Sequence, residues 1–257
     1  MTALVFAPTQ PDRLYVGTDG QGVYRFDVGQ QGDGYRLVDK TLLNYAHVKS
    51  IASGPDEQVY VLAAEGIFVT DGINWQKLKT VPEPAISMAV DPHNSRIIYA
   101  GGVSSGVYRS ENGGKTWQNI SEGLGLIPGA SLRVTALAVD EQDSKHVVAA
   151  TAYGLGKQIA AWGVYESRRA GEGWTKIGDT EEVVTALRVD DGVVYATTAK
   201  GLKRYGKPNE TPSLVPDLRS LAHPSGAQVL VLTLSFSLGG WALLAGPNRF
   251  TGKNPFS

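Results

Sequence analysis

Short apolar stretches alternate with turns along the first 205 residues, in a pattern that repeats five times. Each repeat has two apolar strands, then a strand that opens on Gly, and often a last strand beside a Trp. Polar alternation is weak in the first two strands, which is typical of strands covered on both faces. The glycines that open the third strands recur every 38 to 57 residues: Gly22, Gly66, Gly106, Gly163 and Gly201.

Four short strands at this interval are the sequence signature of a β-propeller blade. A single blade cannot bury both of its faces, so neighbouring blades must stack around an axis. The composition agrees, since 31 glycines and 42% apolar residues favour an all-β fold rich in turns. We therefore predict a five-bladed β-propeller of four-stranded blades over residues 1–218.

The stretch SENGGKTW, residues 110–117, joins the third and fourth strands of the third repeat. The short side chains of Ser110 and Asn112 are suited to bonding nearby backbone groups in a tight turn. Gly113 and Gly114 permit positive φ. Trp117 would then point back into the blade and bury its indole.

Worn copies of this turn occur at 167–174 (SRRAGEGW) and 70–75 (TDGINW). Active sites are usually not repeated in this way, so we interpret the turn as structural. It resembles the Asp-box, or BNR repeat, whose pattern is Ser-x-Asp/Asn-x-Gly-x-Thr-Trp. The matching residues are Ser110, Asn112, Gly114, Thr116 and Trp117.

The repeat region as a whole resembles bacterial WD40/YVTN/BNR-like propellers, and photosystem II assembly-factor-like propellers in particular. This resemblance implies that the fold, rather than a catalytic residue, carries the function. It also implies a partner in a photosynthetic or electron-transfer complex.

A glycan-active propeller, similar to a sialidase or a glycosidase, is the enzymatic alternative. A glycosidase needs two carboxylates that face one cleft. Asp91, Asp140 and Asp190 each follow a first strand at the same place in the repeat, which favours a role in turns. The Arg-Ile-Pro-type motif of sialidases is missing. We predict that the protein is not an enzyme.

Cofactor and metal sites are not predicted either. The sequence has no Cys, and its four His residues show no metal-ligand spacing. The Gly-rich stretches belong to β-turns and not to phosphate loops. The net charge of −1, without a block of like charges, also argues against nucleic-acid binding.

The segment AQVLVLTLSFSLGGWALLAG, residues 227–246, is uncharged and long enough to span a bilayer. We predict a transmembrane helix here, after a linker at 219–226 and before a short tail at 247–257. Because no secretory signal is visible at the N-terminus, a tail-anchored propeller on the cytoplasmic side is expected. The side chains assigned to the membrane anchor are Val229, Leu232, Phe236, Trp241 and Leu244.

The alternative for this segment is a sixth blade. LRSLAHPSGAQVLVL (218–232) aligns with ISMAVDPHNSRIIYA (86–100), so the chain could instead form a soluble six-bladed propeller. The Gly-aromatic third strand that such a blade needs is missing.

Two irregular insertions, 121–133 and 152–163, carry apolar residues in loops, where recognition usually lies on a rigid scaffold. We predict a scaffold, accessory or assembly subunit that binds other subunits of a membrane protein complex and the bilayer. A glycan-active propeller and a soluble binding module are the alternatives. The candidate partner-binding residues are Leu126, Ile127, Tyr153, Leu155, Ile159 and Trp162.

Overall fold

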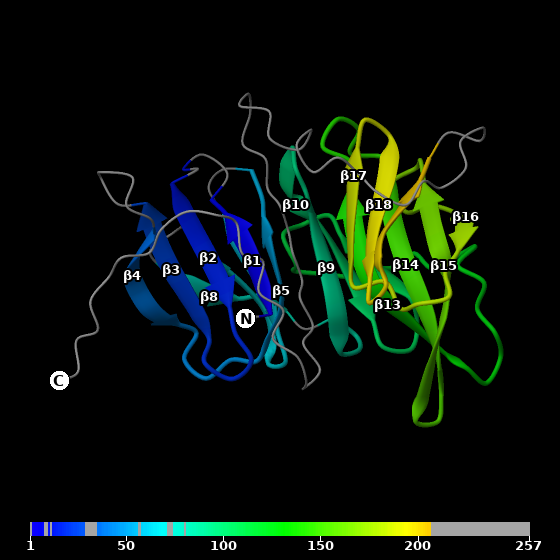
Figure 1. Ribbon diagram of the computed structural model, residues 1–257, viewed down its shortest axis with the longest axis horizontal. Coiled ribbons are helices and arrows are strands. Elements are labelled where there is room, and N and C mark those ends of the chain that lie inside the picture. The colour runs from blue at the N-terminus through cyan, green and yellow to red at the C-terminus, as the bar shows by residue number, and fades with distance from the viewer. Residues whose placement is uncertain are drawn as a thin grey trace.

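The computed structural model describes residues 2–7, 10, 12–28, 35–55, 58–70, 74–79 and 81–206. These residues form five antiparallel sheets, or blades, in chain order (Figure 1). In the described part of the chain, the first four blades have four strands and the fifth has three.

Each blade runs from an inner first strand to an outer last strand. Blade one has β1 (Ala3–Phe6), β2 (Arg13–Gly17), β3 (Val23–Val28) and β4 (Tyr35–Leu42). Blade two has β5 (Val48–Ser53), β6 (Val59–Ala63), β7 (Gly66–Thr70) and β8 (Trp75–Lys77). Blade three has β9 (Ala85–Asp91), β10 (Asn94–Gly102), β11 (Val107–Ser110) and β12 (Gln118–Asn119). Blade four has β13 (Ser131–Val139), β14 (Val147–Leu155), β15 (Gln158–Ser167) and β16 (Thr175–Asp179). Blade five has β17 (Ala186–Asp190), β18 (Val193–Thr198) and β19 (Gly201–Tyr205).

The inner strands are apolar because neighbouring blades cover both of their faces. Every residue of β6, with the sequence VYVLA, is buried. β1 packs on β5, β5 on β9, β9 on β13, and β13 on β17, so the blades follow one another in series. The cores consequently lie between blades, and each combines side chains of two successive sheets.

Glycines determine where most third strands begin. Gly22, Gly66, Gly106 and Gly201 all have positive φ, which an L side chain rarely adopts. In blade four the β14–β15 ladder continues past Gly163 to the pair Leu155–Gln158. The resulting long hairpin projects beyond the rest of its sheet (Figure 1), and it accounts for the widest interval between repeats.

The prediction of an all-β, five-bladed propeller of mostly four-stranded blades is confirmed. The proposed transmembrane helix at 227–246, its flanking segments and the sixth-blade alternative lie outside the described residues. Within the described part of the chain, no helix is long and apolar enough to cross a membrane.

Candidate functional site at the junction of blades three and four

The turn at 110–117 is closed by its own side chains. The Ser110 hydroxyl oxygen accepts hydrogen bonds from the backbone N–H of Gly114 at 2.8 Å and of Asn112 at 3.3 Å. Asn112 Oδ1 accepts the Thr116 N–H at 2.9 Å, while its Nδ2 donates to Thr116 Oγ1 at 2.7 Å. Gly113 and Gly114 supply two successive positive φ angles. Two side-chain caps therefore fix this turn.

The Trp that follows each turn reaches the preceding blade. Trp117 Nε1 donates to the Lys79 carbonyl of blade two at 3.2 Å, and Trp174 Nε1 donates to the Ile120 carbonyl of blade three at 2.7 Å. Trp117 was expected to point back into the blade, and it packs, partly buried, against the core that blades two and three share. We call these two contacts the Trp117 seam and the Trp174 seam.

The copy at 167–174 keeps only one of the two caps. Ser167 Oγ accepts the N–H groups of Arg169 at 3.2 Å and Gly171 at 3.1 Å, as Ser110 does in blade three. Arg169 stands where Asn112 stands in the first turn, and it cannot accept a backbone N–H. Ala170, a non-Gly residue, has φ +54 where Gly113 has φ +69. The outer half of this turn is thus less constrained.

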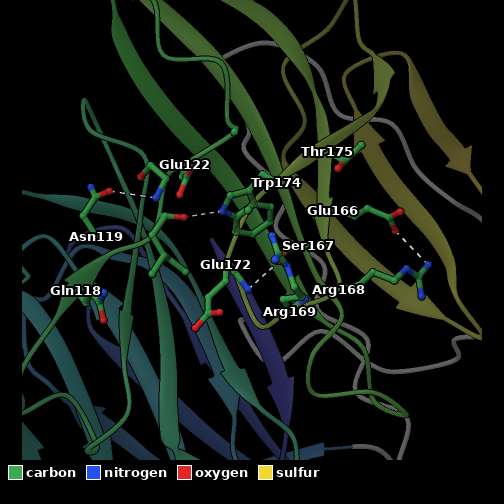
Figure 2. Close-up of a pocket in the computed structure, with 15 residues that line it drawn as sticks. Gln118, Asn119, Glu122, Glu166, Ser167, Arg168, Arg169, Glu172, Trp174 and Thr175 are labelled. Carbon is green, nitrogen blue, oxygen red and sulfur yellow. Dashed lines mark hydrogen bonds and ion pairs between the residues drawn. The ribbon is translucent and has the colours of Figure 1, made fainter.

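A polar groove of about 930 Å³ opens over the Trp174 seam. It lies between the end of blade three and the turn of blade four (Figure 2). The backbone N–H of Trp174 donates to the Glu122 carbonyl at 3.0 Å, so the floor of the groove joins the two blades. Its charged lining residues are Glu122, Glu166, Arg168, Arg169 and Glu172.

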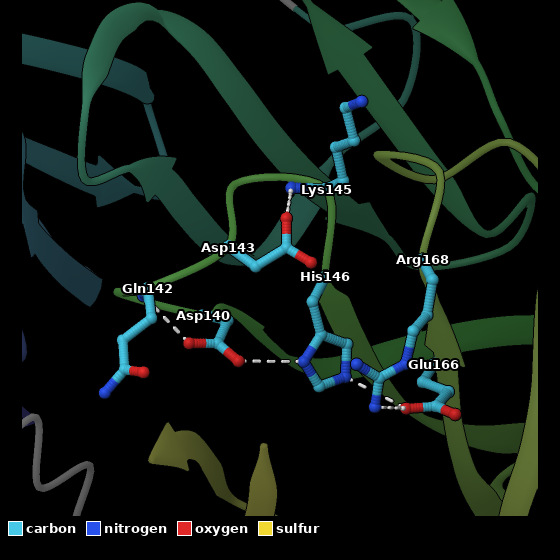
Figure 3. Close-up of polar contacts among 7 residues, drawn as sticks. All are labelled: Asp140, Gln142, Asp143, Lys145, His146, Glu166 and Arg168. Atoms are coloured by element: carbon cyan, nitrogen blue, oxygen red, sulfur yellow. Dashed lines mark hydrogen bonds and ion pairs between the residues drawn. The ribbon is translucent and has the colours of Figure 1, made fainter. Parts of the chain in front are cut away.

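A polar network extends from the groove residue Glu166 to the buried His146 (Figure 3). The fully buried His146 contacts Asp140 Oδ2 through Nδ1 and Glu166 Oε2 through Nε2, both at 2.9 Å. Arg168 contacts the same Glu166 oxygen at 3.2 Å. The network connects the end of β13, the start of β14 and the end of β15, and thereby fixes one carboxylate of the groove.

The carboxylates weighed for glycoside hydrolysis occupy turns. Asp91 is buried, and its Oδ1 accepts from the N–H groups of His93 and Asn94 and from the Ser144 hydroxyl of blade four. Asp140 accepts the Gln142 N–H at 2.9 Å and contacts His146. Asp190 is exposed at the end of β17. Among the described residues, no group of three or more His, Cys, Asp or Glu could hold a metal ion.

The candidate partner-binding residues gather on blade four and the loop before it. Leu155 is 57% exposed, and Leu126, Ile127 and Ile159 are also exposed. Trp162 is 36% exposed. Tyr153 is buried, and its hydroxyl donates to the Gly125 carbonyl. We call the five exposed residues the blade-four surface: Leu126, Ile127, Leu155, Ile159 and Trp162.

Trp162 is held rigidly at the edge of this surface. Its Nε1 donates to the Tyr165 hydroxyl at 2.7 Å, and its ring meets Tyr153 edge-on with a centroid distance of 4.9 Å. The Lys176 ammonium lies 4.5 Å from the Trp162 ring centroid. Burial raises the pKa of Tyr153, so its hydroxyl keeps its proton for the Gly125 contact well above neutral pH.

Sequence reasoning missed the groove and the network beneath it. His146 aligns in the repeat with Ile97 of blade three, so a polar side chain stands where an apolar one is usual. This substitution is the signal that could have revealed the network. Arg168 and Arg169 lie within the imperfect turn copy, where the sequence gives no sign of the groove.

The stacked blades and their repeated turns define a β-propeller. The chain belongs to the DUF6242 beta propeller domain family, whose sequence model matches residues 6–213.

Sequence and structure comparisons find further relatives. Xyloglucanase Xgh74A of Acetivibrio thermocellus is 27% identical over 147 residues, which is 47% of this chain and 17% of the relative. The chain thus spans less than a fifth of the curated relatives it matches. The structure of the Niastella koreensis GH74 enzyme superposes with a TM-score of 0.60 and 19% identity, covering 81% of this chain and 36% of that one. The Cps50 (Swd1) β-propeller domain of Myceliophteria thermophila gives 0.56 and 14%, covering 84% and 69%. At these identities the structural likeness shows the fold alone.

Proposed function

We propose that this propeller is a non-enzymatic scaffold or accessory subunit, and that it binds a protein partner through the blade-four surface. The single observation that carries the proposal is the set of apolar side chains exposed on the extended β14–β15 hairpin and the adjoining loop. Apolar side chains gathered on a projecting element are a usual mark of a protein interface.

The shape of the hairpin suits insertion into a partner. The register pairs Leu155 with Gln158 and Gly154 with Ile159. Because successive strand residues point to opposite faces, Leu155 and Ile159 lie on opposite faces of the hairpin. A tip with apolar groups on both faces gains most when a partner surrounds it.

The aromatic side chains at the base of the hairpin reduce the entropy that is lost when a partner binds. Trp162 and Tyr153 are already fixed by hydrogen bonds before any partner arrives. Binding therefore loses little side-chain entropy at these positions. A rigid, partly exposed Trp is also a frequent hot spot of protein interfaces.

The membrane part of the proposal rests on the sequence. The apolar segment 227–246 would anchor the propeller at a bilayer, on the cytoplasmic side, beside the complex it serves. The assignment of that complex as photosynthetic or electron-transferring rests on the resemblance to assembly-factor-like propellers alone. The interpretation of 110–117 as an Asp-box rests on the residues that match the motif pattern.

Co-purification from native membranes tests the proposal. The full chain is isolated in mild detergent after a carbonate wash, and its co-purifying proteins are identified by mass spectrometry. We expect Leu155→Ser and Ile159→Ser to lose the partner. Tyr45→Ser is the matched control. Tyr45 is 82% exposed and lies in the connection between blades one and two, apart from the blade-four surface. Equal recovery with all three variants would contradict the proposal.

A glycan-active propeller is the second candidate, favoured by the sequence match to a xyloglucanase and by the polar groove with Glu122, Glu166 and Glu172. Release of reducing sugar from xyloglucan by the full chain, abolished by Glu122→Gln or Glu172→Gln, would establish it. Unchanged xyloglucan is the result that the scaffold proposal predicts.

A further inference from the structure

The inner strands of three blades share an irregularity near their beginning. The ladder of β5 with β6 shifts between Val48 and Ser50, and that of β13 with β14 shifts between Val134 and Ala136. The β9–β10 ladder shifts at the same place, between Ala85 and Ser87. A bulge re-aims the extra residue away from the regular pleat. The extra residues are Lys49, Ile86 and Thr135.

Lys49 is the charged member of this set. Its ammonium donates to the Ala85 carbonyl of blade three at 3.1 Å, so the side chain crosses from one innermost strand to the next. Since the first strands of successive blades pack on one another, the ammonium lies among the inner strands β5 and β9. Burial lowers the pKa of Lys49, the charge of Glu65 opposes this lowering, and the nearby Arg133 cation adds to it.

Arg133 on β13 approaches the same region from blade four. Ser87, two residues after Ala85, donates from Oγ to the carbonyl of Val134 at 2.6 Å, and Leu132 N–H donates to the Ser104 carbonyl at 3.0 Å. These bonds hold the backbone on both sides of Arg133 against blade three. Three successive blades thus place Arg133 beside the strand that the Lys49 ammonium reaches, close enough for the charge of Arg133 to act on Lys49.

The guanidinium of Arg133 is not neutralised by any described residue. Its Nε is shielded from solvent without a hydrogen-bond partner, and none of the ion pairs in the described part of the chain includes it. Arg109, whose Nε is similarly shielded, pairs with Glu111 at 3.0 Å. Unlike Arg109, Arg133 therefore has a guanidinium that could pair with an external anion.

The carboxylates near this place leave a positive excess. Glu65 acts on Lys49 from an exposed turn. Glu83 is occupied, because its carboxylate accepts the N–H groups of Ser104 at 3.0 Å and Ser105 at 2.9 Å. Two half-buried cations against one exposed carboxylate form an attractive site for an anion.

We propose that Lys49 and Arg133 form an oxyanion-binding site on the inner side of the propeller, for a ligand with a phosphate or carboxylate group. The arginine would supply a planar fork of donors, and the lysine a point charge opposite it. The site goes beyond the proposed scaffold function, and it is independent of the blade-four surface.

Isothermal titration and thermal melting of the full chain test the site, with inorganic phosphate in one arm and acetate in the other. Both arms are held at one ionic strength with chloride, so that general screening is constant. We expect saturable binding and a melting temperature that rises with anion concentration. Binding of phosphate alone would point to a phosphorylated ligand, and equal binding of acetate to a carboxylate, including an acidic side chain of a partner. Binding of neither overturns the proposal.

Variants assign the response to the two residues. Lys49→Met and Arg133→Met are expected to weaken binding at least about tenfold, whereas the exposed-residue controls Lys115→Met and Arg96→Met keep it. Without anion, each of the two test variants should melt at or above the wild-type temperature, because a like-charge repulsion is removed. Lys49→Arg keeps a cation and should keep binding. Equal binding by all variants contradicts the assignment.

Discussion

The Trp117 seam and the Trp174 seam use one contact in two different settings. In both, an indole N–H from the turn of one blade meets a backbone carbonyl at the outer edge of the preceding blade. Around Trp117 the turn is closed by two caps, from Ser110 and Asn112. Around Trp174 the second cap is lost, and a polar groove lies beside the turn. The comparison teaches that one repeated contact holds the blades together, so that the parts around it can vary.

The largest expected effect comes from removing the two indoles. Trp174 is buried, so Trp174→Ala should cost about 3–5 kcal/mol of the free energy of unfolding. Trp117 is partly exposed, so Trp117→Ala should cost roughly half as much. Urea unfolding of both variants measures the difference. Equal costs would show that the two seams are equivalent.

The network of His146 exists in blade four and not at the aligned Ile97 of blade three. His146→Ile should therefore cost about 2–4 kcal/mol, because Asp140 Oδ2 and Glu166 Oε2 lose the buried imidazole that lies between them. Adding Glu166→Gln should recover part of this loss, which a double-mutant cycle in urea would measure. A neutral His146→Ile would mean that the network has no role in stability.

A pH dependence is expected at the same junction. Tyr99 of blade three donates its hydroxyl to the Ala170 carbonyl in the turn of blade four at 3.3 Å. Burial raises the pKa of Tyr99 to about 12. The unfolded chain thus loses this proton first, and stability falls as pH rises from about 10 to 12, by about 1.4 kcal/mol at pH 11. Comparison of wild type with Tyr99→Phe in urea at pH 9 and pH 11 isolates the effect, since the variant should lack this part of the fall.

The smallest expected effect converts one turn into the other. Arg169→Asn places in blade four the side chain that caps the turn of blade three, with the Gly173 N–H as its donor. We expect a gain of about 0.5–1 kcal/mol in the free energy of unfolding. The matched removal, Asn112→Ala, should lose a similar amount. A loss with Arg169→Asn would show that the two turns differ in more than this one cap.

The repeat predicted the fold because local and global signals agree in it. Gly at the start of a third strand, apolar inner strands and Trp beside the fourth strand each recur, so their alignment places the strands without knowledge of contacts. The direction of Trp117 could not be read in this way. A repeat states what each blade contains, and not which of its two neighbours a side chain reaches.

The sequence predicted the exposed insertion of blade four, but it did not predict the contacts between residues that are distant along the chain. The apolar residues of 152–163 stood out as an insertion, and all but Tyr153 of the residues chosen there are exposed. The meeting of Asp140, His146 and Glu166 depends on strands that are distant in sequence. The approach of Lys49 to Arg133 depends on three blades. Neither arrangement leaves a local sequence pattern, apart from His146 at a repeat position where blade three has Ile97.

Photocrosslinking in native membranes tests the central claim, that the blade-four surface binds a protein partner, most directly. A photoreactive amino acid is placed at position 155 of the full chain, and at position 45 as the control. The account predicts one discrete crosslinked protein from position 155 and none from position 45. No crosslink from position 155, or the same products from both positions, would contradict it.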